Sequence, residues 1–521
     1  MRKIPKKPKK TFSRRATFAS FLNDKTSLYT LGILILATGV AIGFRIFKAA
    51  KTGIIYDGVY SLFNFGTSYS NALTLYKNPN NNHVINSILM NFCRIHFSDC
   101  EYFFRIHAII FSGIYCISIA YLAWTLFVNR FLRFFFMVLL SFQWFVFDLS
   151  FLARGYSIAL TAIYGGLALL VFFLKRKMPF SRIWLPILIL VGMNFLALGS
   201  MLSALEVVFA LNLSYITLFS HRVFYPGQKR IKSLLIHLCT VPVFSGILLY
   251  LLYKSIYRDI FASREHFGKA ALWTHLKEVL WTNILAADSL WARWVYILFL
   301  ALTAAALCYG IFSLFKAKGS GKAYYFDPST PQSLIVYTTL ILFAVLYVYR
   351  NVLDMSLGYP RNSVFLIPLF LMSCGILLDG MLADITHALR HKIVLAVICI
   401  SVGMMTFAAR PSPYAVKVYG WDLQSMVGPL MHDLKKIDPQ RTWKIAVTQG
   451  TRYTNLSLQY YLFRGYKFQY AHSSDYDIFV CHQSENVTLG RWYKEDFYDS
   501  FQCKIGFNPN IVQKYNLTEQ Q

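Results

Sequence analysis

Residues 28–47, LYTLGILILATGVAIGFRIF, form the first long apolar run of the chain and decide the class of fold. As a helix, a run of this length spans about 30 Å, which matches the hydrocarbon core of a bilayer. Similar runs recur along the 521 residues, of which 56% are hydrophobic and 15% charged, against roughly 25% charged in a soluble protein. Lipid offers no hydrogen bonds to backbone N–H and C=O groups, so only helices and closed barrels can cross the bilayer core. The long, unalternating runs therefore predict a polytopic α-helical membrane protein.

We expect about eleven transmembrane helices, at residues 28–47, 104–127, 134–152, 156–174, 183–200, 202–220, 233–252, 291–315, 333–350, 362–379 and 391–409. Five loops that would share a side with the basic N-terminus are themselves basic: NRFLR (129–133), KRKMPFSR (175–182), SHRVFYPGQKRIK (220–232), KAKGSGKAYYF (316–326) and LRHK (389–392). Cytoplasmic loops carry an excess of Lys and Arg, so the N-terminus is predicted to be cytoplasmic and the C-terminus extracytoplasmic. This explains the net charge of +28 without nucleic acid as a partner.

The chain divides into three predicted parts. Residues 1–27 form a cytoplasmic basic tail, which we interpret as the flank of an uncleaved anchor rather than a signal peptide. Residues 28–410 form the transmembrane domain, with a first outer loop at 48–103. Residues 411–521 contain strand-like WKIAVTQG and YDIFVCHQ and a helix-like WDLQSMVGPLMHDLKKI, which predict a small extracytoplasmic α/β domain.

Two pairs of cysteines fall in the predicted outer segments. Cys93 and Cys100 share the first outer loop, and Cys481 and Cys503 share the C-terminal tail. Pairs confined to the oxidising side of a membrane fit disulfides. No Cys/His cluster in the sequence has the spacing of metal ligands.

The first outer loop contains an isolated acid, Asp57, in GIIYDGVYSLFNFG (53–66). Acids at a membrane surface are costly and often functional, although Asp57 could instead cap a helix that begins at GVYSLF. Farther along, Asn82 and His83 precede VINSILMNF, whose apolar spacing predicts an interfacial helix. His83 either binds a ligand at the mouth of the bundle or simply starts this helix.

Two arginines are predicted on the outer side, against the positive-inside tendency. Arg154 and Tyr156 lie in LSFLARGYSIAL, and Arg361 lies in GYPRNSVFLIPLF. An Arg there suits a lipid phosphate, which its planar fork binds bidentately, or it snorkels to the headgroups. Arg258 and His266, in the basic, aromatic middle loop, either line the substrate path or belong to a solvated face.

The order and common sidedness of these motifs resemble those of the integral-membrane GT-C glycosyltransferases. The chain is similar to the protein O-mannosyltransferases and the bacterial lipid A aminoarabinose transferases over residues 28–410, most strongly over 50–170. The resemblance implies a polyprenyl-phosphate sugar donor and transfer to a glycan, lipid or protein acceptor on the extracytoplasmic face. Separately from the resemblance, we expect a bacterial inner-membrane location.

The resemblance places the base or acceptor-positioning residue of the family at Asp57. The family often has an Asp-Glu pair here, whereas Gly58 follows Asp57 in this sequence. One carboxylate can deprotonate the acceptor hydroxyl and arginines can stabilise the leaving phosphate, so we expect an inverting reaction without cofactor or metal, although a divalent metal is not excluded.

Two other classes remain open at this point. A transporter or flippase for a lipid-linked sugar fits the number of spans, but the sequence shows no internal repeat of the transporter kind. A membrane scaffold with an outer binding domain explains the tail and leaves the outer motifs unexplained.

Overall fold

The computed structural model describes residues 25–51, 61, 68–69, 83–97, 101–176, 184–216, 228–253, 330–352, 364–383, 433–447, 468–470, 476–482, 491–494 and 503–515. Several sequence-based expectations fall outside these residues, namely the spans at 291–315 and 391–409, nearly all of the basic tail, the middle loop and the boundary at 410/411.

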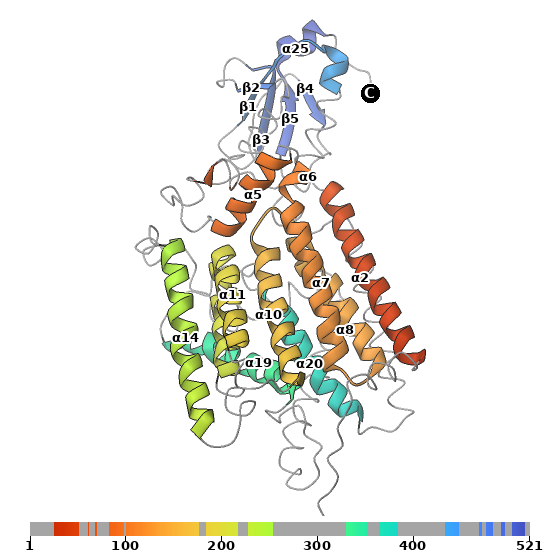
Figure 1. The fold of residues 1–521 in the computed structure, drawn as a ribbon. Helices are drawn as coiled ribbons and strands as arrows, with labels where there is room; N and C mark the ends of the chain where they lie inside the picture. The colour runs from red at the N-terminus through yellow and green to blue at the C-terminus, as the bar shows by residue number, and fades with distance from the viewer. Residues whose placement is uncertain are drawn as a thin grey trace, which may run out of the picture.

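The longer helices form one bundle, in which α10 lies against α7 and α11, and α12 lies against α19 (Figure 1). Its helices are α2 (Lys25–Lys51), α7 (Ile106–Leu126), α8 (Arg130–Phe142), α9 (Trp144–Ser150), α10 (Tyr156–Arg176), α11 (Trp184–Ser200), α12 (Leu205–Ser214), α14 (Gln228–Tyr253), α19 (Pro331–Tyr347) and α20 (Leu366–Ala383). Two more helices, α5 (Val84–His96) and α6 (Glu101–Phe104), lie at one end of the bundle, which we call the α5 end (Figure 1).

Four of the described helices, α2, α7, α10 and α14, are long and apolar enough to cross a membrane. Shorter apolar helices occur at Trp184–Ser200, Leu202–Ser214, Pro331–Tyr347 and Leu366–Leu382. On α14, exposed apolar side chains such as Leu238, Phe244 and Ile247 suit contact with lipid. The chain is therefore a multi-pass membrane protein, while the total of eleven spans stays a prediction.

The third span differs from the uninterrupted helix expected at 134–152. It is divided into α8 and α9 at Gln143, whose backbone has φ −55° and ψ 115°. The Gln143 side-chain oxygen accepts a hydrogen bond from the Val146 amide at 2.8 Å, so this residue caps the second helix. Helix α9 then ends at Ser150, shortly before the turn at the α5 end.

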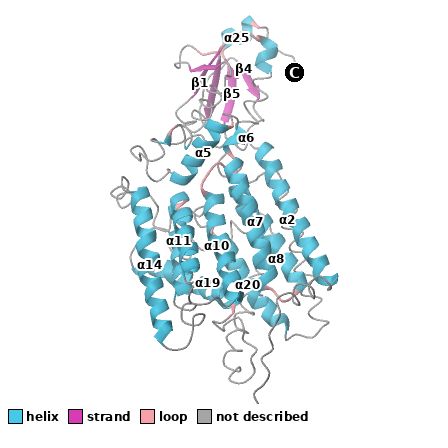
Figure 2. Cartoon of the chain, in the orientation of Figure 1, coloured by secondary structure: helices cyan, strands magenta, loops and turns pink. Residues whose placement is uncertain are grey.

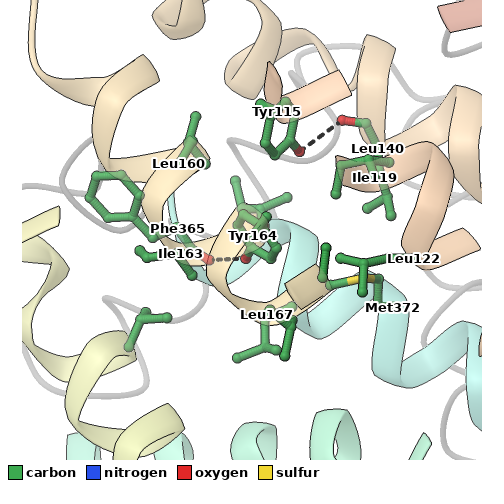
Figure 3. Packing of buried hydrophobic residues seen from close by; sticks show 14 of the residues in the cluster. Tyr115, Ile119, Leu122, Leu140, Leu160, Ile163, Tyr164, Leu167, Phe365 and Met372 are labelled. Atoms are coloured by element: carbon green, nitrogen blue, oxygen red, sulfur yellow. Dashed lines mark hydrogen bonds between the residues drawn. The ribbon is translucent and has the colours of Figure 1, made fainter. Parts of the chain in front are cut away.

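Two buried tyrosines connect the helices at the centre of the bundle (Figure 3). The Tyr115 hydroxyl in α7 donates to the Leu140 carbonyl in α8 at 3.1 Å, and the Tyr164 hydroxyl in α10 donates to the Phe365 carbonyl at 2.5 Å. The two rings meet edge to face, with centroids 5.7 Å apart. A buried hydroxyl without a partner costs about 1–3 kcal/mol, so these bonds favour one arrangement of the helices.

A five-stranded sheet lies beyond the α5 end of the bundle (Figures 1 and 2). Its strands are β1 (Trp443–Val447), β2 (Phe468–Tyr470), β3 (Ile478–His482), β4 (Arg491–Lys494) and β5 (Cys503–Phe507), in the order β2-β1-β3-β5-β4. Strand β1 pairs in parallel with β2 and β3, whereas β5 pairs antiparallel with β3 and β4. A short helix, α25 (Pro509–Lys514), follows β5.

An ion pair ties the start of β1 to the start of β3. The Asp477 carboxylate accepts from Arg441 Nη2 at 2.7 Å and Nε at 3.2 Å, and from the Lys444 amide at 2.9 Å. The Arg441 guanidinium also lies over the Trp443 ring, 5.2 Å from its centroid. A bidentate, mostly buried pair of this kind holds the sheet more firmly than an exposed pair.

Candidate functional site at the α5 end

Arg154 lies in the turn between α9 and α10, and the structure buries it at the α5 end, with 2% of its surface exposed. Its Nη1 atom is 3.5 Å from the hydroxyl of Ser61, which is also buried. Ser61 follows Asp57 by four residues in the first outer loop. The structure therefore joins the Arg154 turn to the segment in which the sequence places the candidate carboxylate.

The Arg154 turn packs tightly against the end of α11. A Cβ atom on Gly155 would lie 2.1 Å from the Ser200 carbonyl oxygen, so only glycine permits this approach. The buried hydroxyls of Ser157 and Ser200 have no hydrogen-bond partner among the described residues. Buried hydroxyls are normally hydrogen-bonded, so these two retain capacity to bind a polar group beside Arg154.

We expect Gly155→Ala to destabilise the protein by about 1–3 kcal/mol, because the new methyl group forces the turn away from Ser200. Gly192→Ala is the matched control: it lies on α11 with nothing within 4 Å of the added Cβ, and alanine favours the helix. Thermal unfolding of both purified variants measures the difference. Equal melting temperatures would contradict the tight contact between the turn and α11.

His83 immediately precedes α5 and is buried. Its carbonyl accepts from the Ser87 amide at 2.8 Å, but its side chain makes no capping hydrogen bond. The helix-start interpretation therefore applies to the His83 backbone. Tyr156 is also buried and is the first residue of α10, directly after the Arg154 turn.

A second polar group at this end connects α5 to α7 and to the Arg154 turn. The His107 Nε2 atom lies 2.8 Å from Asn86 Oδ1, and the Asn86 amide donates to the Ala153 carbonyl at 3.4 Å. Asn86 is fully buried and His107 nearly so. Neither residue was predicted as a site residue from the sequence, although a histidine at the start of an apolar run was a signal for His107.

The disulfide expected at Cys93 is not formed in the structure. Cys93 is a free, buried thiol, with its Sγ atom 4.0 Å from His107 Nδ1, because α5 continues through residue 93 and turns this side chain toward α7. Burial raises the pKa of the Cys93 thiol above its ordinary value. Its expected partner, Cys100, lies outside the described residues. In the sheet, Cys503 is aligned with His482, and Cys481 with Lys504, so the second cysteine pair stays a prediction.

Further cations are buried near the end of α2, where the sequence analysis assigned no site. Arg45 donates to the Ser150 hydroxyl at 3.0 Å and the Ser141 carbonyl at 2.6 Å, and Arg105 donates to the Ala49 carbonyl at 2.8 Å. Lys48 is buried in the same region. Together with Arg154, these side chains concentrate positive charge at the α5 end.

The remaining candidate residues lie outside the described part of the chain. These residues are Asp57, Asn82, Arg258, His266 and Arg361. Within the described part, no group of three or more His, Cys, Asp or Glu residues is placed to hold a metal ion. Metal dependence at Asp57 therefore stays a matter of prediction.

The fold of the chain is similar to that of a solved archaeal oligosaccharyltransferase. The crystal structure of the apo oligosaccharyltransferase from Archaeoglobus fulgidus superimposes with a TM-score of 0.50 at 12% sequence identity. The match covers 84% of this chain and 64% of that one, so this chain spans less than two thirds of that enzyme's length.

A second structure is similar to a lesser degree. It is the archaeal oligosaccharyltransferase AglB from Archaeoglobus fulgidus in complex with an inhibitory peptide and a dolichol-phosphate, with a TM-score of 0.45 at 11% identity. It covers 89% of this chain and 70% of that one. No protein-family model matches the sequence, and a search of curated proteins gave no match.

Proposed function

We propose that this protein is a glycosyltransferase that moves a sugar from a polyprenyl-phosphate donor to an acceptor hydroxyl at the α5 end of the bundle. The observation that carries the proposal is the contact of buried Arg154 with Ser61, because it brings a phosphate-binding cation beside the loop of the candidate carboxylate. The fold supports the same class, since its neighbour from Archaeoglobus fulgidus is an oligosaccharyltransferase.

The donor phosphate would be bound on the Arg154 side of the site. A guanidinium forms paired hydrogen bonds to phosphate oxygens, and the hydroxyls of Ser157 and Ser200, which have no partner among the described residues, can donate further bonds. Buried cations near the end of α2 add a favourable potential for an anion. The interior position strengthens each of these interactions relative to water.

In the proposed reaction, Asp57 takes the proton of the acceptor hydroxyl as this oxygen attacks the anomeric carbon. The bond from that carbon to the phosphate oxygen breaks, and polyprenyl phosphate leaves with the electron pair. Arg154 stabilises the negative charge that develops on the phosphate. Attack opposite the leaving group inverts the anomeric centre, and the protein's own cations perform the charge stabilisation without a metal.

The other candidate residues complete the proposed site. His83, Asn82 and Tyr156 would contact the donor sugar, and Arg361, Arg258 and His266 would contact the lipid or the acceptor. We propose a bacterial inner-membrane location with a cytoplasmic N-terminus, which makes the α5 end extracytoplasmic. The C-terminal sheet would then lie on the same side as the site and face a glycan, lipid or protein acceptor.

The purified full-length protein in proteoliposomes tests this proposal against the transporter alternative. Radiolabelled polyprenyl-phosphate sugars are added with a panel of glycan, lipid and peptide acceptors. We expect labelled product and free polyprenyl phosphate in equal amounts, with none from sugar nucleotides. Movement of label across the bilayer with the sugar–phosphate bond intact would instead establish transport.

A further inference from the structure

The polar group of α5 forms a hydrogen-bond chain with a fixed direction. Asn86 uses its Nδ2 atom to donate to the Ala153 carbonyl, so its Oδ1 atom is the acceptor that faces His107 Nε2. An amide oxygen cannot donate, and His107 Nε2 therefore carries the proton. This leaves the lone pair of His107 Nδ1 facing the Cys93 thiol. In the neutral imidazole the chain therefore selects one tautomer, with the proton on Nε2.

The last link of the chain holds the backbone directly before Arg154. On one side, Gly155 is packed against the Ser200 carbonyl, where even a methyl group would collide. On the other side, Ala153 accepts the bond from Asn86. The turn is thus held between α11 and α5, and the α5 restraint depends on Asn86 keeping its orientation. The bond from His107 fixes that orientation.

We propose that Asn86 and His107 are positioning residues that hold the Arg154 turn against α5 and so aim the guanidinium at the donor phosphate. This inference rests on the proposed function, in which Arg154 binds that phosphate. Neither residue touches the substrate in this account. A buried polar chain that reaches a turn from a neighbouring helix can fix its geometry because each displaced member would leave a buried group unsatisfied.

Two substitutions of the same imidazole separate positioning from a general packing role. In His107→Gln the side-chain amide reaches the region of Nε2 and can still donate to Asn86. In His107→Asn the shorter amide reaches only the region of Nδ1, so the bond to Asn86 is lost. Both variants replace an aromatic ring with a neutral amide. If His107 acted only by packing, both variants would disturb the Arg154 turn, because neither side chain replaces the ring.

The experiment uses the full-length protein in nanodiscs, with polyprenyl phosphate as the probe and Arg154→Ala as the reference variant. Amide hydrogen exchange across residues 151–156 reports the turn, and competition binding reports the dissociation constant. For His107→Asn we expect exchange about tenfold faster and binding about tenfold weaker. For His107→Gln we expect both quantities within about twofold of the wild type.

The outcomes separate failure of this inference from failure of the proposed function. If Arg154→Ala weakens binding while His107→Asn leaves exchange or binding unchanged, the positioning role is wrong and the donor site stands. If His107→Gln is as impaired as His107→Asn, the residue acts through packing and the inference is overturned. If Arg154→Ala itself binds the probe normally, the assignment of Arg154 to the donor phosphate is wrong, and the positioning inference falls with it.

Discussion

Arg154→Ala is expected to lower kcat/KM for the polyprenyl-phosphate donor by about 10²–10³-fold, which corresponds to about 3–4 kcal/mol of lost transition-state stabilisation. The guanidinium is buried and lies beside the first outer loop. Water therefore cannot take over the stabilisation of the charge on the leaving phosphate when the guanidinium is removed. Arg154→Lys should recover only part of the rate, because an ammonium keeps the charge and lacks the planar, paired donors.

Initial rates of donor consumption measure this effect in vesicles that hold equal amounts of folded protein. Lys175→Ala is the matched control, since Lys175 lies exposed near the far end of α10, the helix that follows the Arg154 turn, and its loss changes the net charge equally. We expect the control to stay within about twofold of the wild type. An Arg154→Ala enzyme with unchanged kcat/KM would place the phosphate elsewhere.

The sequence predicted the helices of the bundle well, because their stability in lipid depends on features that a sequence displays. A run such as 106–126 is apolar on every side, and a membrane allows it hardly any other structure than a helix. The break at Gln143 was missed for a related reason. No glycine or proline lies at the break. Gln143 separates the two helices through a side-chain cap on α9, and a hydropathy profile does not detect such a cap.

The candidate site could be predicted only in part. Arg154 was found because an outer arginine contradicts the usual distribution of charge. The link between Asn86 and His107 joins residues 21 positions apart on different helices, and it depends on how α5 lies across the start of α7. The error at Cys93 has the same origin, since the orientation of α5 sends that thiol into the protein. The spacing of apolar residues predicts which face of a helix is buried. It does not predict how that helix is oriented relative to its neighbours.

Asp57→Asn is expected to lower kcat by about 10²–10⁴-fold while the dissociation constant of polyprenyl phosphate changes by less than about threefold. The amide keeps the size of the side chain and removes its ability to take the acceptor proton. Binding should survive because the phosphate is held by Arg154 and its neighbours, on the other side of the reacting carbon. The measurement is a single-turnover rate at saturating donor, with binding of the probe measured on the same preparation.

The pH dependence gives this prediction a second, independent readout. A general base acts in its ionised form, so the wild-type rate should fall as the pH drops through the pKa of Asp57, and Asp57→Asn should lack that limb of the profile. Asp433→Asn removes an acid from the helical turn before β1, and serves as the control that should leave rate and profile unchanged. If Asp57→Asn transfers sugar at the wild-type rate, this acid caps a helix, and the proton of the acceptor must go to another group. A collapsed rate with intact binding would contradict the capping role, because asparagine caps a helix about as well as aspartate and would leave the rate unchanged.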